Sequence, residues 1–245
     1  MSGVRNCRRA GSSLAGCAFL FCTRLSKITM SVPVSSVSRA RRPAGRPRAF
    51  DAQAALEAAV VHFWERGYAD TSLDDLVIAM GIGRSSFYAF FGSKHAVMMA
   101  ALSLYNSRLQ ERFASAAASE PDPRAAVLRV LELVACTQKP IYGCLFVNLV
   151  SELAPRDADV REQCDIHQRA VGGIVIALLR RAGFRPAAAR KQSGALLSLA
   201  IGLITLRKGG ASERHIREVL VSAARQLLAR PPEPREMRAL DGGTG

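Results

Sequence analysis

The first 50 residues contain no aspartate or glutamate, although the whole chain of 245 residues has 20 acidic side chains. The same stretch has ten lysines and arginines, so it carries most of the formal net charge of +14. A basic segment without acidic partners suits a polyanion, either nucleic acid or an anionic membrane surface. Because it is also rich in serine and proline, we expect residues 1–48 to form a disordered basic arm.

Long hydrophobic runs are also missing. The sequence has no stretch of about 18 apolar residues, so we expect no membrane span and a cytoplasmic, nucleoid-associated protein. A short apolar run at 14–22 follows three arginines in the outline of a signal peptide, but no clear cleavage site comes after it. Met30 offers an alternative that we favour, in which residues 1–29 are a mis-assigned start. A third reading is a basic protein anchored to a membrane by residues 1–29.

Paired cysteine and histidine motifs are absent as well. The six cysteines form no C-x-x-C pair and the four histidines are scattered, so the spacing predicts neither a zinc site nor a disulfide framework. Gly-x-Ser-x-Gly and a phosphate-cradling glycine loop are also missing. We therefore expect no metal, no cofactor and no enzymatic activity, and an enzyme is the least favoured alternative.

The residues that are abundant favour helices. Ala, Leu and Arg dominate and strand-type runs are scarce, which predicts an all-α fold of about nine helices. We expect a three-helix module in residues 49–98, a larger helical domain in 99–230 and a disordered tail in 231–245. Apolar periodicity, interrupted by Gly and Pro, places the helices; they are expected at 51–66, between 72 and 80, and at 84–91, 93–118, 124–138, 143–154, 157–182, 187–208 and 212–230.

Two short helices in the N-terminal module have clear start and stop signals. Ser72 and Asp75 have the spacing of a capping box, and Gly81-Ile82-Gly83 breaks the first short helix before the second begins. Two short helices joined by a tight turn that contains glycine predict a helix-turn-helix, in which the second helix enters the major groove of DNA. We expect its small core to contain Phe63, Leu73, Leu76, Ile82, Phe87 and Phe91.

Two segments of this module carry a distinctive pattern: residues 67–76, with sequence GYADTSLDDL, and residues 79–94, with sequence AMGIGRSSFYAFFGSK. In these residues the region resembles the TetR family of transcriptional regulators. The family pattern has an apolar residue, Tyr, Phe and Lys in the spacing of Phe87, Tyr88, Phe91 and Lys94. One departure is Gly83, which stands where many members have Ser or Thr as the helix cap, so one hydroxyl that could contact phosphate is lost.

The resemblance implies DNA-binding roles for matching residues. Tyr88 and Lys94 are expected to contact phosphates, as is the helix start at Thr71 and Ser72. Base-edge contacts are expected from the outward residues of the second helix, which are Arg84, Ser85, Ser86 and Ala89. The arm arginines are expected to reach the minor groove or the flanking backbone; they are Arg41, Arg42, Arg46 and Arg48.

Each of these roles has a simpler alternative. Tyr88 could only pack on the following helix, and Arg84 could contact only the DNA backbone. The arm arginines could belong to a solvated tail. By contrast, Phe87 and Phe91 are expected in the core and not as stacking platforms for single-stranded nucleic acid.

The resemblance is looser after about residue 100, where regulators of this type have a helical effector-binding and dimerisation domain. Residues 141–155 resemble a segment of one broad subgroup, and in them Cys144, Asn148 and Glu152 are candidates for an effector pocket. The alternative is that Asn148 and Glu152 bond locally or cap neighbouring helices and that Cys144 is a small core residue. A helix N-terminus can also activate a thiol such as Cys144.

The last two predicted helices have apolar stripes that suit a homodimer, although they could instead complete the core of one chain. These stripes consist of Ala195, Leu196, Leu199, Leu203, Leu206, Ile216, Val219, Leu220, Ala223 and Leu227. The resulting hypothesis is a dimeric repressor that binds a palindromic operator in double-stranded DNA and is released by a small-molecule effector. A non-specific basic protein bound to DNA or a membrane is the main alternative.

Overall fold

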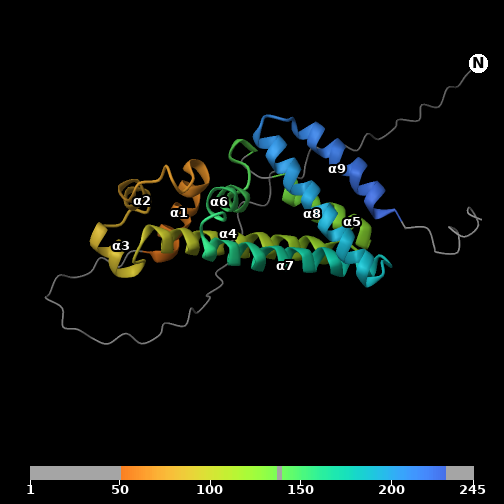
Figure 1. Ribbon diagram of the computed structural model, residues 1–245, viewed down its shortest axis with the longest axis horizontal. Helices are drawn as coiled ribbons and strands as arrows, with labels where there is room; N and C mark the ends of the chain where they lie inside the picture. Colours follow the sequence, from red (N-terminus) through yellow and green to blue (C-terminus); the bar gives the residue numbers. More distant parts are fainter. Residues whose placement is uncertain (1–50, 137–139, 230–245) are drawn as a thin grey trace, which may run out of the picture. The chain divides into compact units, whose positions relative to one another are not determined.

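A computed structural model describes residues 51–136 and 140–229, all of which belong to one compact unit. Every regular element in these ranges is helical (Figure 1), which confirms the all-α prediction. The elements are α1 (Ala52–Arg66), α2 (Leu73–Ala79), α3 (Arg84–Phe90), α4 (Lys94–Ser119), α5 (Pro123–Ala135), the 3-10 helix η1 (Pro140–Tyr142), α6 (Leu145–Leu153), α7 (Ala158–Arg181), α8 (Pro186–Lys208) and α9 (Glu213–Leu228). None of these helices has the length and hydropathy needed to cross a membrane.

Some predictions lie outside the described residues. These concern the basic arm with Arg41, Arg42, Arg46 and Arg48, and the tail at 231–245. They stay predictions, as does the domain boundary between residues 98 and 99.

Side-chain caps begin the helices of the N-terminal module where the sequence predicts them. The Asp51 carboxylate accepts hydrogen bonds from the backbone of α1, and the Ser93 hydroxyl accepts one from Ala96 in α4. Ser72 and Asp75 form the reciprocal bonds of a capping box at the start of α2. Each cap satisfies backbone N–H groups that have no partner within the helix, so these starts are encoded locally.

Proline moves two helix starts by one residue relative to the sequence prediction. Pro123 and Pro186 are the first residues of α5 and α8, which were expected to begin at 124 and 187. Proline is tolerated in this first position because its missing N–H would have no helical partner there. Helix α5 ends at Ala135, three residues before the predicted end, and Cys136 follows it in a non-helical conformation.

Two hydrophobic clusters form the core. The first joins α1, α2, α3 and the first half of α4 to residues of α6, and Phe63, Leu76 and Phe87 in it have no exposed surface. The other predicted residues of this small core, Leu73, Ile82 and Phe91, are half-buried against it. The second cluster contains α5, α8, α9 and the distal part of α7. Helix α6 is therefore packed directly on the helices of the N-terminal module.

The apolar stripes of α8 and α9 mainly fill the core of the single chain. Leu196 and Leu203 of α8 and Ile216 and Leu220 of α9 are buried in the second cluster. Leu206 is different, because 53% of its surface is exposed. Periodicity alone could not separate these two environments, since both kinds of residue recur at helical spacing.

Candidate nucleic-acid interface

The turn between α2 and α3 depends on two glycines with different conformations. Gly81 has φ +65°, a left-handed conformation that residues with a side chain rarely adopt. Gly83 has φ −78° and ψ 153° and is the N-cap of α3, where it offers no side chain to the free N–H groups. The turn is closed by a hydrogen bond from the Ile82 N–H to the Val77 carbonyl at 3.3 Å. The two short helices thus form the predicted helix-turn-helix.

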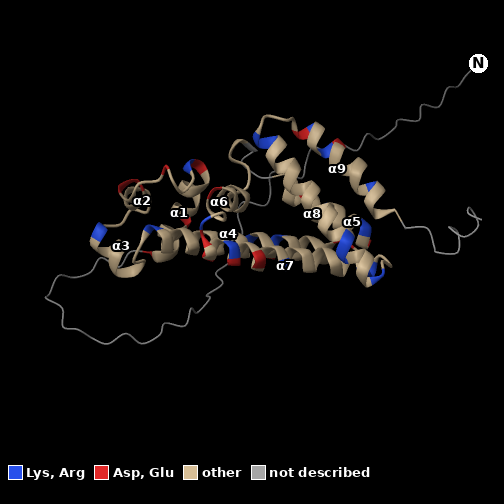
Figure 2. Ribbon diagram, viewed as in Figure 1, with Lys and Arg blue, Asp and Glu red and all other residues tan. Residues whose placement is uncertain are grey.

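Helix α3 turns a polar and aromatic surface away from the core. Phe87 is fully buried, while Ser85, Tyr88 and Ala89 are exposed and Ser86 is half-buried. The Tyr88 and Phe87 rings are nearly perpendicular, with a centroid distance of 5.6 Å, and 55% of Tyr88 is still exposed. The helix has one basic residue, at its start, and no acidic residue (Figure 2). This outward surface can approach a polyanion without electrostatic repulsion from α3.

Arg84 is exposed but paired. Its guanidinium donates to the Asp74 carboxylate of α2, and this contact raises the pKa of Arg84. Both side chains remain more than half exposed. Exposed ion pairs contribute little to stability, so DNA could take the guanidinium from Asp74 at little cost.

Lys94 and Thr71 make internal contacts that the sequence did not predict. The Lys94 ammonium donates to the Tyr68 and Thr71 carbonyls at 2.9 and 2.7 Å and lies 4.1 Å from the centre of the Tyr68 ring. Thr71 is only 1% exposed, and its hydroxyl donates to the Gly67 carbonyl at 2.6 Å. Its backbone N–H donates to the Tyr68 carbonyl, so Thr71 offers no group to a phosphate in this conformation. Ser72 is exposed, although its hydroxyl belongs to the capping box.

Two exposed apolar residues of the helix-turn-helix itself were missed by sequence reasoning. Phe90, the last residue of α3, is 61% exposed, and Ile78 on α2 is 77% exposed. The available signal was the aromatic run at 87–91, because a short helix can bury only one side. Phe90 is therefore a further candidate for apolar contact with DNA.

The predicted effector-pocket residues are all engaged in internal contacts. The Tyr105 hydroxyl donates to the Cys144 sulfur at 3.5 Å, and burial raises the pKa of this thiol, contrary to the activation considered for it. The Asn148 amide donates to the Tyr142 carbonyl at 2.7 Å and accepts from Lys208 at 3.0 Å. Glu152 accepts two backbone hydrogen bonds from the loop between α1 and α2. The bond from Asn148 to Tyr142 is local, as the alternative expected, whereas the partners of Glu152 lie more than 80 residues earlier in the chain.

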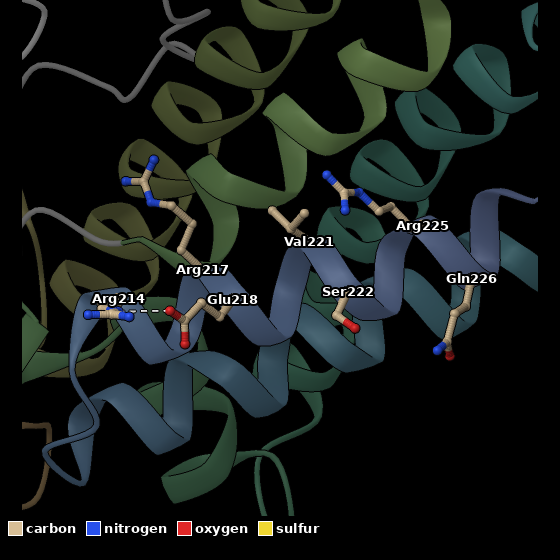
Figure 3. Close-up of a pocket in the computed structure, with 7 residues that line it drawn as sticks. All are labelled: Arg214, Arg217, Glu218, Val221, Ser222, Arg225 and Gln226. Carbon is tan, nitrogen blue, oxygen red and sulfur yellow. Dashed lines mark hydrogen bonds and ion pairs between the residues drawn. The ribbon is translucent and has the colours of Figure 1, made fainter. Parts of the chain in front are cut away.

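A surface pocket lies elsewhere, along the outside of α9 (Figure 3). Figure 3 shows Arg217, Val221 and Arg225 on one side of the helix, and an ion pair joins Arg214 to Glu218 at 2.8 Å. The remaining lining residues are Ser222 and Gln226. Because the pocket lies on a helix expected to contact a second chain, it gives no specific evidence for a small-molecule site.

Three potential metal ligands meet between α4 and the start of α7. One ligand atom from each of His95, Asp157 and Asp159 lies within 4.8 Å of the others. His95 bonds to Asp157 at 2.8 Å, and the second oxygen of Asp157 caps α7. Both carboxylate oxygens of Asp157 are thus used by the protein, and we assign no metal here. Sequence spacing did not reveal this group because His95 is 62 residues from Asp157.

Comparison with known proteins agrees with this geometry. The family model described as "Bacterial regulatory proteins, tetR family" matches residues 55–101, which contain the helix-turn-helix. The segment that contains the helix-turn-helix therefore matches the TetR family. The repressor ComR of Escherichia coli is 32% identical over 124 residues, which is 49% of this chain and 59% of ComR. The regulator EthR of Mycolicibacterium smegmatis is 34% identical over 106 residues, which is 41% of this chain and 49% of EthR.

Structural similarity to TetR-family regulators extends further than sequence similarity. A cysteine-substituted form of the regulator CifR, solved with a 26-base-pair operator DNA, has a TM-score of 0.62 and 28% identity. The match covers 77% of this chain and all of that one. By sequence, the chain spans only about half to three fifths of the curated relatives named above. Those relatives are transcriptional regulators by name, and neither name describes an enzyme.

Proposed function

We propose that this TetR-family protein is a DNA-binding transcriptional regulator, and specifically a repressor that binds a palindromic operator. The observation that carries the proposal is the exposed surface of α3, where Ser85, Tyr88 and Ala89 face outward while Phe87 anchors the helix in the core. Such a helix can enter the major groove, where side chains contact base edges. The repressor role is supported by the names of relatives such as ComR.

Within this interface we assign different roles to different residues. Tyr88, Ser72 and the free donor of Lys94 are proposed to position the protein on phosphates, which carry no sequence information. Arg84, Ser85, Ser86 and Ala89 are proposed to contact base edges, and Phe90 to make apolar contacts beside them. Thr71 contributes through the loop that it stabilises. The arm arginines Arg46 and Arg48 are proposed to contact the minor groove or backbone beyond the main site.

The test is selection from a random duplex library with the full chain, followed by titrations at several salt concentrations. Enrichment of one palindrome would support the proposal. Tyr88→Phe should weaken binding to all sequences, whereas Ser85→Ala should change the preference at one base position. Ser103→Ala, at an exposed site on α4, is the matched control and should change neither. Sequence-blind binding that falls steeply with salt would instead indicate the non-specific basic protein.

A palindromic operator requires two copies of the module, and we propose that α8 and α9 form a homodimer. Support comes from the exposed side of α8, where Ile201 and Leu206 are 37% and 53% exposed among small residues such as Gly202. The two recognition helices would then reach half-sites about 34–36 Å apart, or a multiple of that distance. Sedimentation should show a dimer that Leu206→Asp dissociates. Ile166→Asp, at an exposed apolar site on α7, is the control and should leave the dimer intact.

We also propose that a small-molecule effector releases the protein from DNA, and that it is held near Asn106 and not by the residues first predicted. Asn106 of α4 is 4% exposed, and within residues 51–136 and 140–229 neither its amide nitrogen nor its oxygen has a hydrogen-bond partner. One turn along, Gln110 lies 3.2 Å from His167 of α7, whose ring lies 4.4 Å from that of Phe146. A buried amide without partners is unfavourable, and a neutral ligand with a donor and an acceptor would satisfy it.

A thermal-shift screen of neutral amides and phenols would test this site. Compounds that stabilise the wild-type protein but not Asn106→Leu, and that also release operator DNA, would support it. If every stabilising compound acts equally on both proteins, Asn106 does not contact the effector and its amide is satisfied by water.

A further inference from the structure

The loop that connects α1 to α2 is held by a carboxylate from a distant helix. The N–H groups of Tyr68 and Ala69 donate to the two oxygens of Glu152 at 3.0 and 2.6 Å. Glu152 lies near the end of α6, more than 80 residues further along the chain. Hydrogen bonds to an ionised acceptor are stronger than neutral ones, and two adjacent donors fix the direction of the peptide that presents them.

A positively charged side chain, Lys94, binds the carbonyl groups of the same loop. The Lys94 ammonium, at the start of α4, can only donate hydrogen bonds, and it donates to the carbonyls of Tyr68 and Thr71. The donors of the loop therefore meet an anion from α6, and its acceptors meet a cation from α4. With both kinds of backbone group bound, the loop has few ways to move without breaking a charge-assisted hydrogen bond.

Glycine at position 67 makes this approach of Glu152 possible. Gly67 ends α1 with φ +82°, and a Cβ added there would lie 3.1 Å from a Glu152 oxygen. Both the backbone conformation and the space next to the carboxylate thus favour a residue without a side chain. The Glu152 carboxylate at the end of α6 therefore lies directly against the backbone of Gly67.

The other end of the same helix face is bound to the C-terminal half of the chain. Asn148, one turn before Glu152, donates to the Tyr142 carbonyl and accepts from Lys208 at the end of α8. Residues four apart lie on one side of a helix, so this polar face of α6 links the end of α8 to the loop before α2. Because both Glu152 oxygens are used, the residue is occupied by the protein itself and not available to an effector.

We infer that Glu152 is a positioning residue for the recognition helix, acting through the loop and α2. The loop leads directly into the Ser72 cap of α2, and α2 is joined to α3 by the turn that the Ile82–Val77 hydrogen bond closes and by the shared core cluster. A shift of the loop would therefore tilt both short helices. This inference rests on the proposed function, because the consequence of a tilted α3 is weaker operator binding.

Hydrogen exchange and operator titration on the full chain test the inference together. In Glu152→Ala, the amides of Tyr68 and Ala69 should exchange faster, those of α2 and α3 should follow, and operator affinity should fall at least tenfold. Glu152→Gln keeps one acceptor and should give intermediate values, which also protects the test if the alanine variant folds poorly. Glu162→Gln, at an exposed site on α7, is the control and should match the wild type.

Two results would overturn the inference. One is unchanged exchange at Tyr68 and Ala69 in Glu152→Ala, which would mean that the carboxylate does not hold the loop. The other is faster exchange confined to these two amides, with α2, α3 and operator affinity unaffected, which would mean that the contact is only local. If the wild-type protein itself selects no operator, the proposed function fails, and exchange in α2 and α3 without DNA still decides whether Glu152 positions them.

Discussion

The two glycines of the helix-turn-helix turn allow the same substitution to have opposite effects on stability. Gly81 and Gly83 are both open, because an added Cβ at either position would meet no atom within 4 Å. They differ in backbone conformation, since φ is +65° at Gly81 and −78° at Gly83. Replacing each by serine therefore isolates the effect of φ and of helix capping from that of packing.

Gly83→Ser should stabilise the protein by about 0.5–1 kcal/mol. The hydroxyl can cap α3 and adds a few tenths of a kcal/mol, while the loss of glycine freedom in the unfolded chain adds about 0.4–1 kcal/mol. Gly81→Ser should destabilise the protein by about 1 kcal/mol. The left-handed conformation costs a residue with a side chain about 1–2 kcal/mol, and the lower freedom of serine in the unfolded chain offsets only part of that cost.

Urea unfolding followed by Trp64 fluorescence would measure both changes, because Trp64 is the single tryptophan and packs between α1 and α4 against Tyr105. The two urea midpoints should move in opposite directions. The free energies of unfolding of the two serine variants should differ by about 1.5–2 kcal/mol. Gly83→Ala adds the Cβ without the cap and should be less stable than Gly83→Ser by about 0.5–1 kcal/mol. If both serine variants shift the midpoint in the same direction, then the turn geometry described above is wrong.

Three further predictions use the charges and titrating groups. Replacing the four arginines at positions 41–48 by alanine should reduce the slope of log K against log salt by up to about 0.9 for each lost phosphate contact, and an unchanged slope would leave them as a solvated tail. Cys144 is 6% exposed with a raised pKa, so iodoacetamide should alkylate it more slowly than the half-buried Cys164 in the native protein but equally in urea; faster labelling of Cys144 would contradict this. Burial lowers the pKa of His167 from 6.5 to about 4, so the unfolded chain binds its proton first, and the free energy of unfolding should fall by up to about 3 kcal/mol between pH 6.5 and 4. Urea titrations at pH 7 and pH 4.5 should show a smaller fall for His167→Gln, and an equal fall would assign the pH dependence to other groups.

The sequence could specify the helix-turn-helix because its signals are local. Ser72 and Asp75 form their capping box three residues apart, and Asp51 caps α1 within one turn. Such bonds depend only on nearby residues, so a short pattern is enough to predict them. The resemblance to the TetR family then identified the outward residues of α3, because its spacing is confined to the same segment.

Residue roles that depend on distant partners could not be read in this way. Lys94 matches the family pattern, yet its ammonium bonds to carbonyls more than 20 residues earlier in the chain. Asn148 and Glu152 were correctly placed on one face of a helix, but Lys208 and the loop at Tyr68 and Ala69 lie 60 to 84 residues away from them in the sequence. For that reason the two residues were assigned to a pocket. The apolar stripes of α8 were equally ambiguous, since Leu203 is buried while Leu206 is exposed.

By itself, the sequence determined the all-helical class, the capped recognition module and its resemblance to the TetR family, since each follows from spacing within one or two turns. Only the tertiary structure decided that Thr71 is buried, that Asn106 lacks a partner within the described residues and that Glu152 holds the loop before α2. The physical reason is that burial and long-range hydrogen bonds depend on which helices pack together. That choice is made by the whole core and not by any single segment.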